Sequence, residues 1–574
     1  MPPASATRRW VFPAPTDEAR AQALSSELRL PPALCRLLVN RGYGEPAAVR
    51  DFLRPPAGHI HAPRLLAGMD DAVERIVRAI RGGETILVHG DYDVDGICST
   101  ALFSRALGKM GARAVPFVPH RLQDGYDLSE AGIRSAHEAG ATLIVTGDCG
   151  IVAHEAVARA RSLGIDVVVT DHHTPGPTLP PAAAVVNPNR ADCPYPDKGL
   201  AGVGVAYKLC CAVADAVGFP AERLHAYLDL VALATIADLA PLTGENRALV
   251  RWGLRVLPQT PNPGLRALLR VTGLEGKDVT ASQVGFVLAP RLNAVGRMGE
   301  ALRGVRLLTT DDPREAEEIA LTLDQENRWR QTVDGQTLRD ALETLERGYD
   351  PARDYGVVLA AEGWHPGVIG IVASRVVERI HRPTVLIALA GAEDGKGSAR
   401  SIPGFHLYEA MRACSGHLTR FGGHRMAAGC SIRPEAVDAF RESFNAHAHG
   451  VLRPDHLVPE VRIDLEVELH HADEQLARML RHAGPFGAGN ATPVFATRGV
   501  GLVGYPRVVG QNHLKLTLGA HGRTMDAIGF GMGERTKEPV FAGGPVDVAY
   551  KLEENHYNGR TQVQAKIVDV RPAE

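Results

Sequence analysis

One short stretch of the chain changes abruptly from apolar to acidic. An apolar run at 86–88 is followed by three carboxylates at alternate positions, Asp91, Asp93 and Asp95. The apolar run predicts a buried strand, and a helix is predicted after the carboxylates, from about residue 99 to residue 110. Two carboxylates about 4 Å apart repel each other by roughly 1 kcal/mol in water and about 4 kcal/mol at an effective dielectric constant of 20. A packed trio requires cations, so the pattern predicts a metal site at a strand end.

Hydrophobic positions continue to alternate between strand-like runs and one-sided helical patterns before and after this stretch. The predicted elements are a helix at 70–81, strands at 114–118, 141–146 and 166–170, and helices at 129–139 and 153–163. Strands and helices that alternate at this spacing predict a parallel sheet with helices on both faces. Active sites in such sheets lie beyond the carboxyl ends of the strands, which is where the three carboxylates fall.

Three further polar clusters fall at predicted strand ends or in an apolar stretch. Asp148 ends one predicted strand, and Asp171, His172 and His173 follow the next. Asp238 interrupts a later apolar stretch, where an unpaired charge is costly. Each cluster alone has an ordinary explanation, as a helix cap, a surface histidine pair or a satisfied core residue. Their repetition favours one shared metal site.

Other metal sites fit the sequence less well. Asp91, Asp93, Asp95 and Gly96 match the start of an EF-hand calcium loop, but its twelfth position, which should be a glutamate, is Leu102. The eight cysteines form no CxxC pair, which favours reduced thiols over a zinc site or disulfides. Carboxylates with imidazoles suit manganese or magnesium. For the first stretch taken alone, an acidic turn without a metal is the plainer alternative.

Composition narrows the class of protein but indicates no partner. The chain has 574 residues, 45% of them hydrophobic, and this length predicts about three or four domains. Lysines and arginines number 63 against 66 aspartates and glutamates, so no overall basic character indicates nucleic acid. There is no signal-peptide pattern and no apolar run of roughly 18 residues, and we expect a soluble cytoplasmic protein.

The second half of the chain predicts a long helix, a second α/β unit and a series of short strands. The helix covers 314–347 with an interruption at Gly335, and a strand, a helix and a strand follow at 355–360, 368–380 and 383–390. A glycine-rich loop is predicted at 395–401, where backbone N–H groups could approach a phosphate. From about residue 461 apolar positions alternate with period 2, and Asn558 and Gly559 indicate a hairpin turn, which together predict a small barrel.

Four motifs occur in the order that characterises a known superfamily. They are His89 to Gly96, Thr146 to Gly150, Asp171 to His173, and Ala237 with Asp238. On these residues the chain resembles the DHH phosphoesterases. Within that superfamily it is similar to the exonucleases specific for single-stranded DNA, on the segments 290–298, 363–370, 421–424 and 484–490. The resemblance runs from about residue 50 to the C-terminus.

The resemblance implies an α/β fold in five parts. These are an N-terminal segment at 1–50, a DHH catalytic metal-binding domain with a parallel sheet at 51–313, a bridging helix at 314–349, a smaller α/β DHH-associated substrate-binding domain at 350–455, and an OB-like nucleic-acid-binding β-barrel at 456–574. Such barrels bind single strands in a charged groove with stacking aromatic side chains. The candidates for that contact are Arg507, His513, Lys515 and Tyr557.

The resemblance also implies roles for individual residues around two divalent ions, Mn²⁺ or Mg²⁺. One ion is assigned His89, Asp93 and Asp148, and the other is assigned Asp95, Asp148, His172 and Asp238, with Asp148 bridging the two. His173 would contact the scissile phosphate, and Asp91 or Asp171 would orient ligands. The substrate would be bound by residues beyond the metal motifs, namely Arg291, Asn293, Arg297, Ser374, Arg375, Arg400, Gly422, Gly423 and His424.

The expected activity also follows from the resemblance. It is hydrolysis of phosphodiester bonds in single-stranded DNA from the 5′ end, releasing 5′-mononucleotides in recombination and repair. A phosphoesterase of short oligonucleotides, cyclic dinucleotides or pyrophosphate is one alternative, which the added barrel disfavours. A non-catalytic DNA-binding scaffold is the other, which the intact acids and histidines disfavour. The expected partners are single-stranded DNA, a single-stranded-DNA-binding protein and a helicase, with no membrane and a monomeric state.

Overall fold

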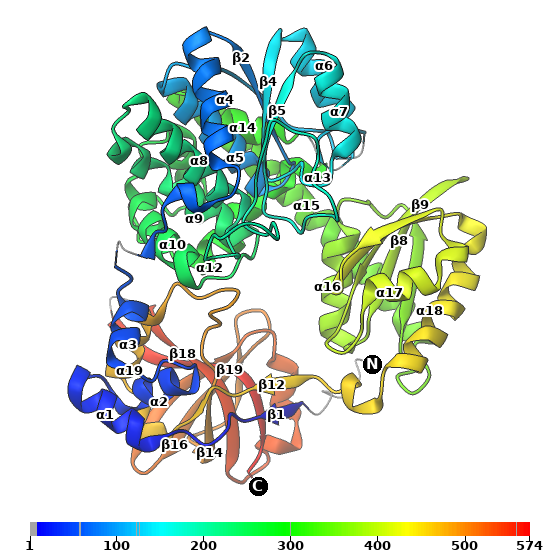
Figure 1. Cartoon of the computed structure of the whole chain (residues 1–574). Helices are drawn as coiled ribbons and strands as arrows, with labels where there is room; N and C mark the ends of the chain where they lie inside the picture. The colour runs from blue at the N-terminus through cyan, green and yellow to red at the C-terminus, as the bar shows by residue number, and fades with distance from the viewer. Residues whose placement is uncertain are drawn as a thin grey trace.

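The computed structural model describes residues 8–56, 59–121, 123–125, 127–298, 300–557 and 560–573, without side-chain positions at 556, 557, 560 and 561. Three units surround a common centre (Figure 1). The unit that carries the acidic motifs lies at the top, a second α/β unit at the right, and a β-rich unit at the bottom. Among the described residues, no helix is long and apolar enough to cross a membrane.

The first unit contains the predicted parallel sheet. Its strand order is β3-β2-β4-β5-β6, all parallel, with β2 at Thr85–Gly90, β3 at Arg113–Phe117, β4 at Ala141–Gly147, β5 at Asp166–Thr170 and β6 at Ala184–Val186. Successive residues of each strand point to opposite faces, so Ile86 and Val88 join one core and Leu87 joins the other. The first core is covered by α4 (Met69–Gly82), α5 (Val94–Lys109) and α8 (Gly202–Val217), and the second by α6 (Glu130–Glu138) and α7 (His154–Ser162). The sheet with helices on both faces is confirmed.

Helix α5 starts earlier than the sequence pattern predicts. It begins at Val94, because the side chain of Asp93 accepts hydrogen bonds from Asp95 N and Gly96 N and so caps the first turn. A Cβ at Gly96 would lie 2.3 Å from Asp91 N. The absence of a side chain at Gly96 therefore permits close packing of the first turn of α5 against Asp91.

The rest of the first unit is helical. It contains α9 (Leu228–Ala237), α10 (Gly244–Val256), α11 (Pro263–Val271), a π-helical turn at Val284–Leu288, α13 (Ala289–Met298) and α14 (Leu302–Thr309). Helix α15 (Pro313–Gly348) then runs on to the second unit without a break. The predicted interruption at Gly335 is wrong, since a glycine costs only about 1 kcal/mol in a helix and buried residues such as Leu323 and Ala341 anchor α15 on both sides of it.

The second unit is a five-stranded sheet in the order β10-β11-β9-β8-β7. Its elements are β7 (Val357–Glu362), α16 (Ile369–Ile380), β8 (Thr384–Ala390), β9 (Glu393–Arg400), α17 (Leu407–Ala413), β10 (Arg420–Gly423), β11 (Ala427–Ile432) and α18 (Val437–Val451). The loop predicted at 395–401 is wrong, because most of it is the central strand β9. Its glycines serve close strand packing, since a Cβ at Gly397 would lie 2.3 Å from the Cys430 sulfur.

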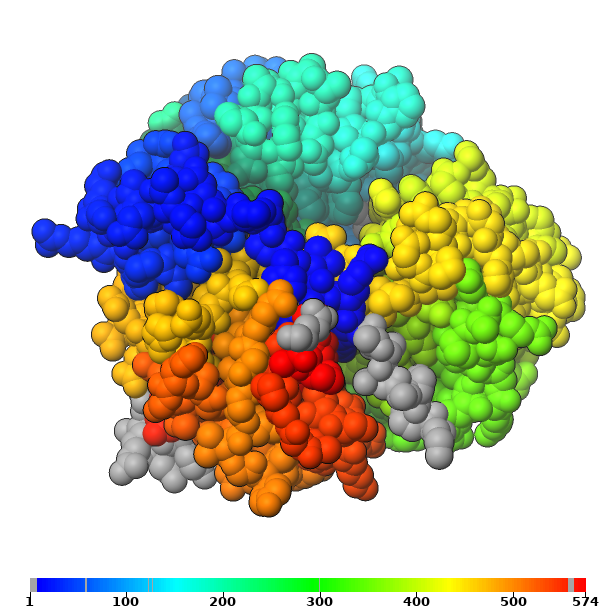
Figure 2. All heavy atoms as spheres, turned by 90° about the horizontal axis from the view of Figure 1, so that it is seen from below, coloured from blue at the N-terminus to red at the C-terminus, as the bar shows by residue number. Residues whose placement is uncertain are grey.

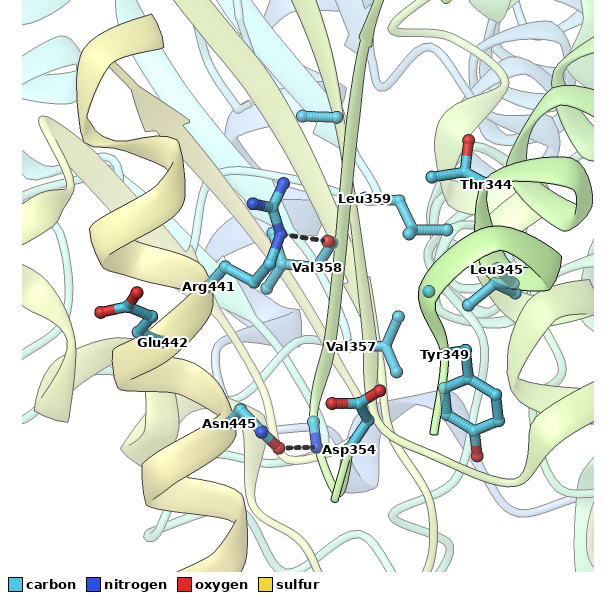
Figure 3. Close-up of a pocket in the computed structure, with 13 residues that line it drawn as sticks. Thr344, Leu345, Tyr349, Asp354, Val357, Val358, Leu359, Arg441, Glu442 and Asn445 are labelled. Atoms are coloured by element: carbon cyan, nitrogen blue, oxygen red, sulfur yellow. Dashed lines mark hydrogen bonds between the residues drawn. The ribbon is translucent and has the colours of Figure 1, made fainter. Parts of the chain in front are cut away.

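Strand β7 is the edge of this sheet and runs between α15 and α18 (Figure 3). Arg441 Nε donates a hydrogen bond of 3.0 Å to Val358 O, and Asn445 Oδ1 accepts bonds from the backbone N–H groups of Tyr355 and Gly356. A cavity of about 380 Å³ lies along this edge. The side chains of α18 therefore satisfy part of the open edge and disfavour pairing with another strand.

The third unit is a barrel-like sheet in the order β13-β14-β18-β19-β17-β16-β15, in which a further pairing of β14 with β16 closes the ring. The strands are β13 (Leu465–Glu466), β14 (Phe495–Leu502), β15 (Arg507–Val509), β16 (His513–Ala520), β17 (Arg523–Gly529), β18 (Val546–Tyr557) and β19 (Arg560–Pro572). The predicted barrel is confirmed. The predicted turn residues Asn558 and Gly559 lie outside the described residues.

The N-terminal segment packs on this barrel. Helices α1 (Glu18–Leu28), α2 (Pro32–Asn40), α3 (Pro46–Leu53) and α19 (Glu474–Ala483) share its apolar core. Strand β1 (Arg9–Val11) pairs in parallel with β12 (Glu460–Arg462). Viewed from below, the blue N-terminal segment lies against the orange and red C-terminal unit (Figure 2). Residues from the two ends of the chain therefore form one folded unit.

Candidate metal centre and substrate cleft

The carboxyl ends of β2, β4 and β5 bring the acidic motifs together. Asp91 follows β2, and the next two carboxylates lie at the start of α5. Both oxygens of Asp95 accept backbone hydrogen bonds from the start of α8, from Gly202 N at 2.7 Å and Val203 N at 2.8 Å. Asp148 follows β4 with a φ of 67°, a conformation that few non-glycine residues adopt. The backbone of three elements therefore fixes where these carboxylates point.

The turn after β5 holds two histidines in defined tautomers. His172 Nδ1 lies 3.1 Å from Leu200 O, and a carbonyl can only accept, so this nitrogen carries the proton. His173 Nδ1 lies 2.8 Å from Asp171 Oδ1 and donates to it. Asp171 also accepts from the backbone N–H groups of both histidines and of Ile151. Asp171 therefore orients the turn, and His172 Nε2 is left as an acceptor that points toward the carboxylates.

Several acceptor atoms meet in this cluster with no donor between them. His172 Nε2 lies 3.1 Å from Asp148 Oδ1, 3.7 Å from Asp238 Oδ2 and 3.9 Å from Asp95 Oδ2. His172 Nε2, Asp148 Oδ1 and Asp91 Oδ1 are buried and have no hydrogen-bond partner among the described residues. Only a proton or a cation can bridge such acceptors. The donor set fits divalent metal ions with oxygen and nitrogen ligands.

The described residues include three groups of possible metal ligands, and within each group the ligand atoms lie within 4.8 Å of one another. Asp148 and His172 link the groups, because each of them belongs to two. The groups are Asp91 with Asp93 and Asp148, Asp95 with His172 and Asp238, and Asp148 with His172 and His173. Two neighbouring ions can therefore be held by one continuous cluster.

Burial and mutual repulsion disfavour the charged carboxylates. Burial first, and then neighbouring carboxylates, raise the pKa of Asp91, Asp95 and Asp148 well above the usual range. The pKa of Asp238 is raised to about 7 by burial and then by Asp93. Burial lowers the pKa of His172 to about 4, with the nearby His173 as a further cause. A bound cation would reverse this balance for the carboxylates.

The pKa of His173 shifts in the opposite direction to the pKa of His172. Burial would lower the pKa of His173, but its hydrogen bond and charge interaction with Asp171 outweigh burial and raise that pKa to about 9. For the same reason the pKa of Asp171 is lowered despite its burial. Pairing with Asp171 therefore favours the imidazolium form of His173, which suits contact with a phosphate oxygen.

His89 lies outside all three groups. His89 is a residue of β2, and its ring is fully buried and packs on Phe117, with a ring centroid separation of 5.1 Å. Its Nε2 lies 3.5 Å from Ser129 N, and its Nδ1 lies 3.7 Å from the Cys149 sulfur. Burial lowers the pKa of His89 to about 4. The resemblance to the DHH phosphoesterases implies a group of His89, Asp93 and Asp148. In the structure the residue grouped with Asp93 and Asp148 is Asp91.

The metal cluster opens into a cavity of about 620 Å³ shared by the first two units. One wall carries Asp91, Asp93, Asp95 and Asp238. Five of the predicted substrate-binding residues line the same cavity, Asn293 and Arg297 from α13 and Arg400, Gly423 and His424 from the second unit. Arg297 Nη1 donates to Gly367 O across the two units at 3.2 Å. An acidic wall and a basic wall therefore face each other across the cavity.

Four predicted substrate-binding residues do not line this cavity. Arg291 Nε donates a hydrogen bond of 2.9 Å to Asp324 Oδ1 on α15. Arg375 pairs with the buried Asp334 at 3.1 Å. The Ser374 hydroxyl donates to Gly370 O, and Gly422 is an exposed residue of β10. Both arginines therefore have partners on the bridging helix.

Arg121 lines the cavity and is missing from the sequence prediction. It lies in the segment between β3 and α6, with its guanidinium 4.7 Å from the ring centroid of Tyr92. No motif surrounds Arg121, so its only signal is its place after a strand whose carboxyl end faces the same edge as β2.

Two of the four candidate residues of the barrel contact neighbouring residues of the barrel. Lys515 Nζ pairs with Asp526 at 2.9 Å, and the ring of His513 lies 5.0 Å from that of Phe530. Arg507 is exposed on the short strand β15. The side chain of Tyr557 lies outside the described residues. The three of these side chains that the structure describes do not line the cavity of the metal cluster.

Comparison with protein families supports the same division of the chain. Residues 85–235 match the model of the DHH family, N-terminal domain. Residues 354–450 match the DHHA1 domain, and residues 463–569 match the RecJ OB domain. The metal cluster falls mainly in the first match, and the basic wall of the cavity falls partly in the second.

Curated relatives and solved structures extend the match to nearly the whole chain. The single-stranded-DNA-specific exonuclease RecJ of Bacillus subtilis is 38% identical over 99% of this chain and 71% of that protein. The protein of the same name from Escherichia coli is 39% identical over 95% of this chain and 96% of that protein. RecJ of Thermus thermophilus in complex with Mn²⁺ superposes with a TM-score of 0.83 at 34% identity, covering 99% of this chain and 80% of that one, and it is also known in complex with Mg²⁺. The chain therefore belongs to the RecJ family.

Proposed function

We propose that this protein is a metal-dependent exonuclease specific for single-stranded DNA, which degrades it from the 5′ end and releases 5′-mononucleotides. The supporting observation is the cavity in which four carboxylates of the metal cluster face arginines from two units. Such an arrangement suits a phosphodiester, because metal ions and guanidinium groups together balance the charge of the phosphate.

The cluster would hold two divalent ions, Mn²⁺ or Mg²⁺. One ion is assigned to Asp91, Asp93 and Asp148, and the other to Asp95, His172 and Asp238, with Asp148 close to both. When bound, the ions supply an activated water and stabilise the charge that develops on the phosphate. The tautomer set by Leu200 O keeps His172 Nε2 available as a ligand.

The chain's own residues position the strand in the cavity. Arg297 and Arg400 are half-buried and line the basic wall, where each can donate hydrogen bonds to phosphate oxygens. His173, protonated through Asp171, holds a proton that it can donate to the scissile phosphate. Asp171 itself orients the histidines through their backbone and side-chain N–H groups.

The barrel favours a long substrate over a small one. A cyclic dinucleotide or pyrophosphate would need only the cavity, whereas a closed barrel with exposed residues such as Arg507 offers a surface for an extended strand. The complete set of acids and histidines in the cluster disfavours a scaffold without catalysis. In the cell we propose a cytoplasmic monomer that acts in recombination and repair, with a single-stranded-DNA-binding protein and a helicase as further partners.

Digestion of end-labelled DNA tests this function. A single strand labelled at either end, a matching duplex and a cyclic dinucleotide are each incubated with Mn²⁺, Mg²⁺ or a chelator. We expect mononucleotides released only from the 5′ end of the single strand, and none with the chelator. Cleavage of the cyclic dinucleotide alone would indicate the small-substrate enzyme, and binding without cleavage would indicate the scaffold.

A further inference from the structure

Three helices from distant parts of the chain meet on the left in Figure 1, where the first unit contacts the barrel. They are α3, α10 and α19. Arg247 of α10 joins them, since its Nε donates to Phe52 O at 3.0 Å and its Nη2 donates to Gly484 O at 2.8 Å. The junction shares no residue with the catalytic cavity.

A cavity of about 440 Å³ opens at this junction, and we call it the arginine pocket. Its lining residues are Arg54, Pro55, Arg251, Trp252, Arg255 and His482. This volume lies in the range of small-ligand sites, about 300 to 1,000 Å³. Three guanidinium groups, an imidazole and an indole converge there, and among the residues that the structure describes no carboxylate lines the pocket.

The positive groups of the arginine pocket repel one another without a counter-ion. Burial first, and then the nearby Arg255 and Arg54, lower the pKa of Arg251. The pKa of His482 is lowered by burial and then by Arg251, Arg54 and Arg481. No acid contributes to either shift. A bound anion would relieve this repulsion.

Helix ends explain only part of this cluster. Cations are favoured near the carboxyl ends of helices, and Arg251 Nη1 accordingly donates to His482 O at 3.0 Å. The side chains of Arg54 and Arg255, in contrast, make no hydrogen bond or ion pair with any described residue. Their guanidinium groups are therefore available to a ligand in the pocket.

The lining chemistry selects one class of anion. Arginine forks bind phosphate through paired hydrogen bonds, and the half-buried indole of Trp252 offers a surface on which a base can stack. We propose that the arginine pocket is a second nucleotide-binding site, separate from the catalytic cavity, which holds the phosphate and base of a 5′-mononucleotide or of a nucleotide within a strand. Both sources present the same phosphate and base to the pocket.

Anomalous diffraction locates the ligand and distinguishes its source. Crystals of the full chain are soaked with 5-iodo-2′-deoxyuridine 5′-monophosphate or with a short oligonucleotide that contains 5-iodo-2′-deoxyuridine. An iodine peak in the arginine pocket with the mononucleotide identifies a free nucleotide as ligand, and a peak with the oligonucleotide alone identifies a strand. Iodine confined to the catalytic cavity, or absent from both, would overturn the proposal.

Calorimetry with thymidine 5′-monophosphate, in the presence of a chelator, tests the residues. The double variant R54A/R255A should bind at least tenfold more weakly at this site, whereas R78A/R134A, which removes two exposed arginines elsewhere in the first unit, should bind like the parent. Trp252→Leu should weaken binding of the nucleotide but leave binding of inorganic phosphate within twofold. Equal nucleotide affinity in R54A/R255A and the parent would contradict the assignment, and unchanged nucleotide affinity in Trp252→Leu would refute base stacking.

Discussion

The two walls of the catalytic cavity use charge in opposite ways. The acidic wall is largely buried, and hydrogen bonds with backbone N–H groups at the starts of two helices hold Asp93 and Asp95 in place. The basic wall is more open, with Arg400 half-buried and His424 exposed, both in the second unit. The comparison indicates that metal binding depends on precise local geometry, whereas substrate binding depends on how two units pack together.

The largest expected effect comes from breaking the metal cluster to which the acidic wall belongs. Asp148→Asn removes the carboxylate shared by two ligand groups, and we expect cleavage of single-stranded DNA to fall by about 10³-fold or more. The melting temperature measured in chelator should not fall, because the substitution removes buried charge repulsion. Activity within a few-fold of the parent would contradict the metal assignment.

Substitutions in the basic wall should reduce cleavage by a smaller factor. They should also distinguish an arginine of the second unit that lines the cavity from one that does not. Arg400→Ala removes a guanidinium that lines the cavity, and kcat/KM for single-stranded DNA should fall by about 100-fold. The affinity for Mn²⁺, measured by calorimetry, should not change. Arg375→Ala is the matched control, since Arg375 pairs with Asp334 outside the cavity. Equal losses in the two variants would argue against a specific role for Arg400.

The metal cluster should also appear in the pH dependence of stability. The pKa of Asp238 is raised to about 7 in the folded chain, so its contribution to stability is greatest at low pH and is lost as the pH rises through 7. In chelator, lowering the pH from about 8 to 6 should therefore stabilise the parent by about 1 kcal/mol relative to Asp238→Asn. Thermal unfolding of both proteins measures this difference. Saturating Mn²⁺ should abolish it, and identical pH dependences in chelator would contradict the raised pKa.

The smallest expected effect lies outside both walls. Arg507→Ala in the barrel should weaken binding of single-stranded DNA by a factor of about 3 at low salt and by less at high salt, because one phosphate contact is lost. Fluorescence anisotropy with a labelled strand measures this change. Cleavage of a dinucleotide, which is too short to reach the barrel, should be unaffected. An equal loss of dinucleotide cleavage would mean that the substitution disturbs the fold and does not simply remove a contact with the DNA strand.

The sequence predicts the acidic wall better than the basic one, for a physical reason. Alternating carboxylates after an apolar strand report local geometry, and parallel strands place such ends at one edge, so Asp148 and His172 could be predicted to meet Asp95. The different directions of His89 and Asp91 could not be predicted, because both flank Gly90 and only tertiary packing places the His89 ring against Phe117 and Asp91 beside Asp93 and Asp148.

The basic wall depends on contacts between distant segments. Arg291 and Arg297 lie on one helix and look equally suitable in the sequence, yet Asp324 of α15 holds the first while the second lines the cavity. Arg121 carries no motif at all. The glycines at 395 and 397 predicted a loop, but their lack of side chains permits close packing of β9 against its neighbours. Local patterns do not contain this information, since it arises from tertiary packing.

The most direct test of the two-wall account is anomalous diffraction at the manganese edge from crystals soaked with Mn²⁺. We predict two peaks in the acidic wall, one within reach of Asp91, Asp93 and Asp148, and one within reach of Asp95, His172 and Asp238. A peak coordinated by His89, or the absence of manganese from this wall, would contradict the account.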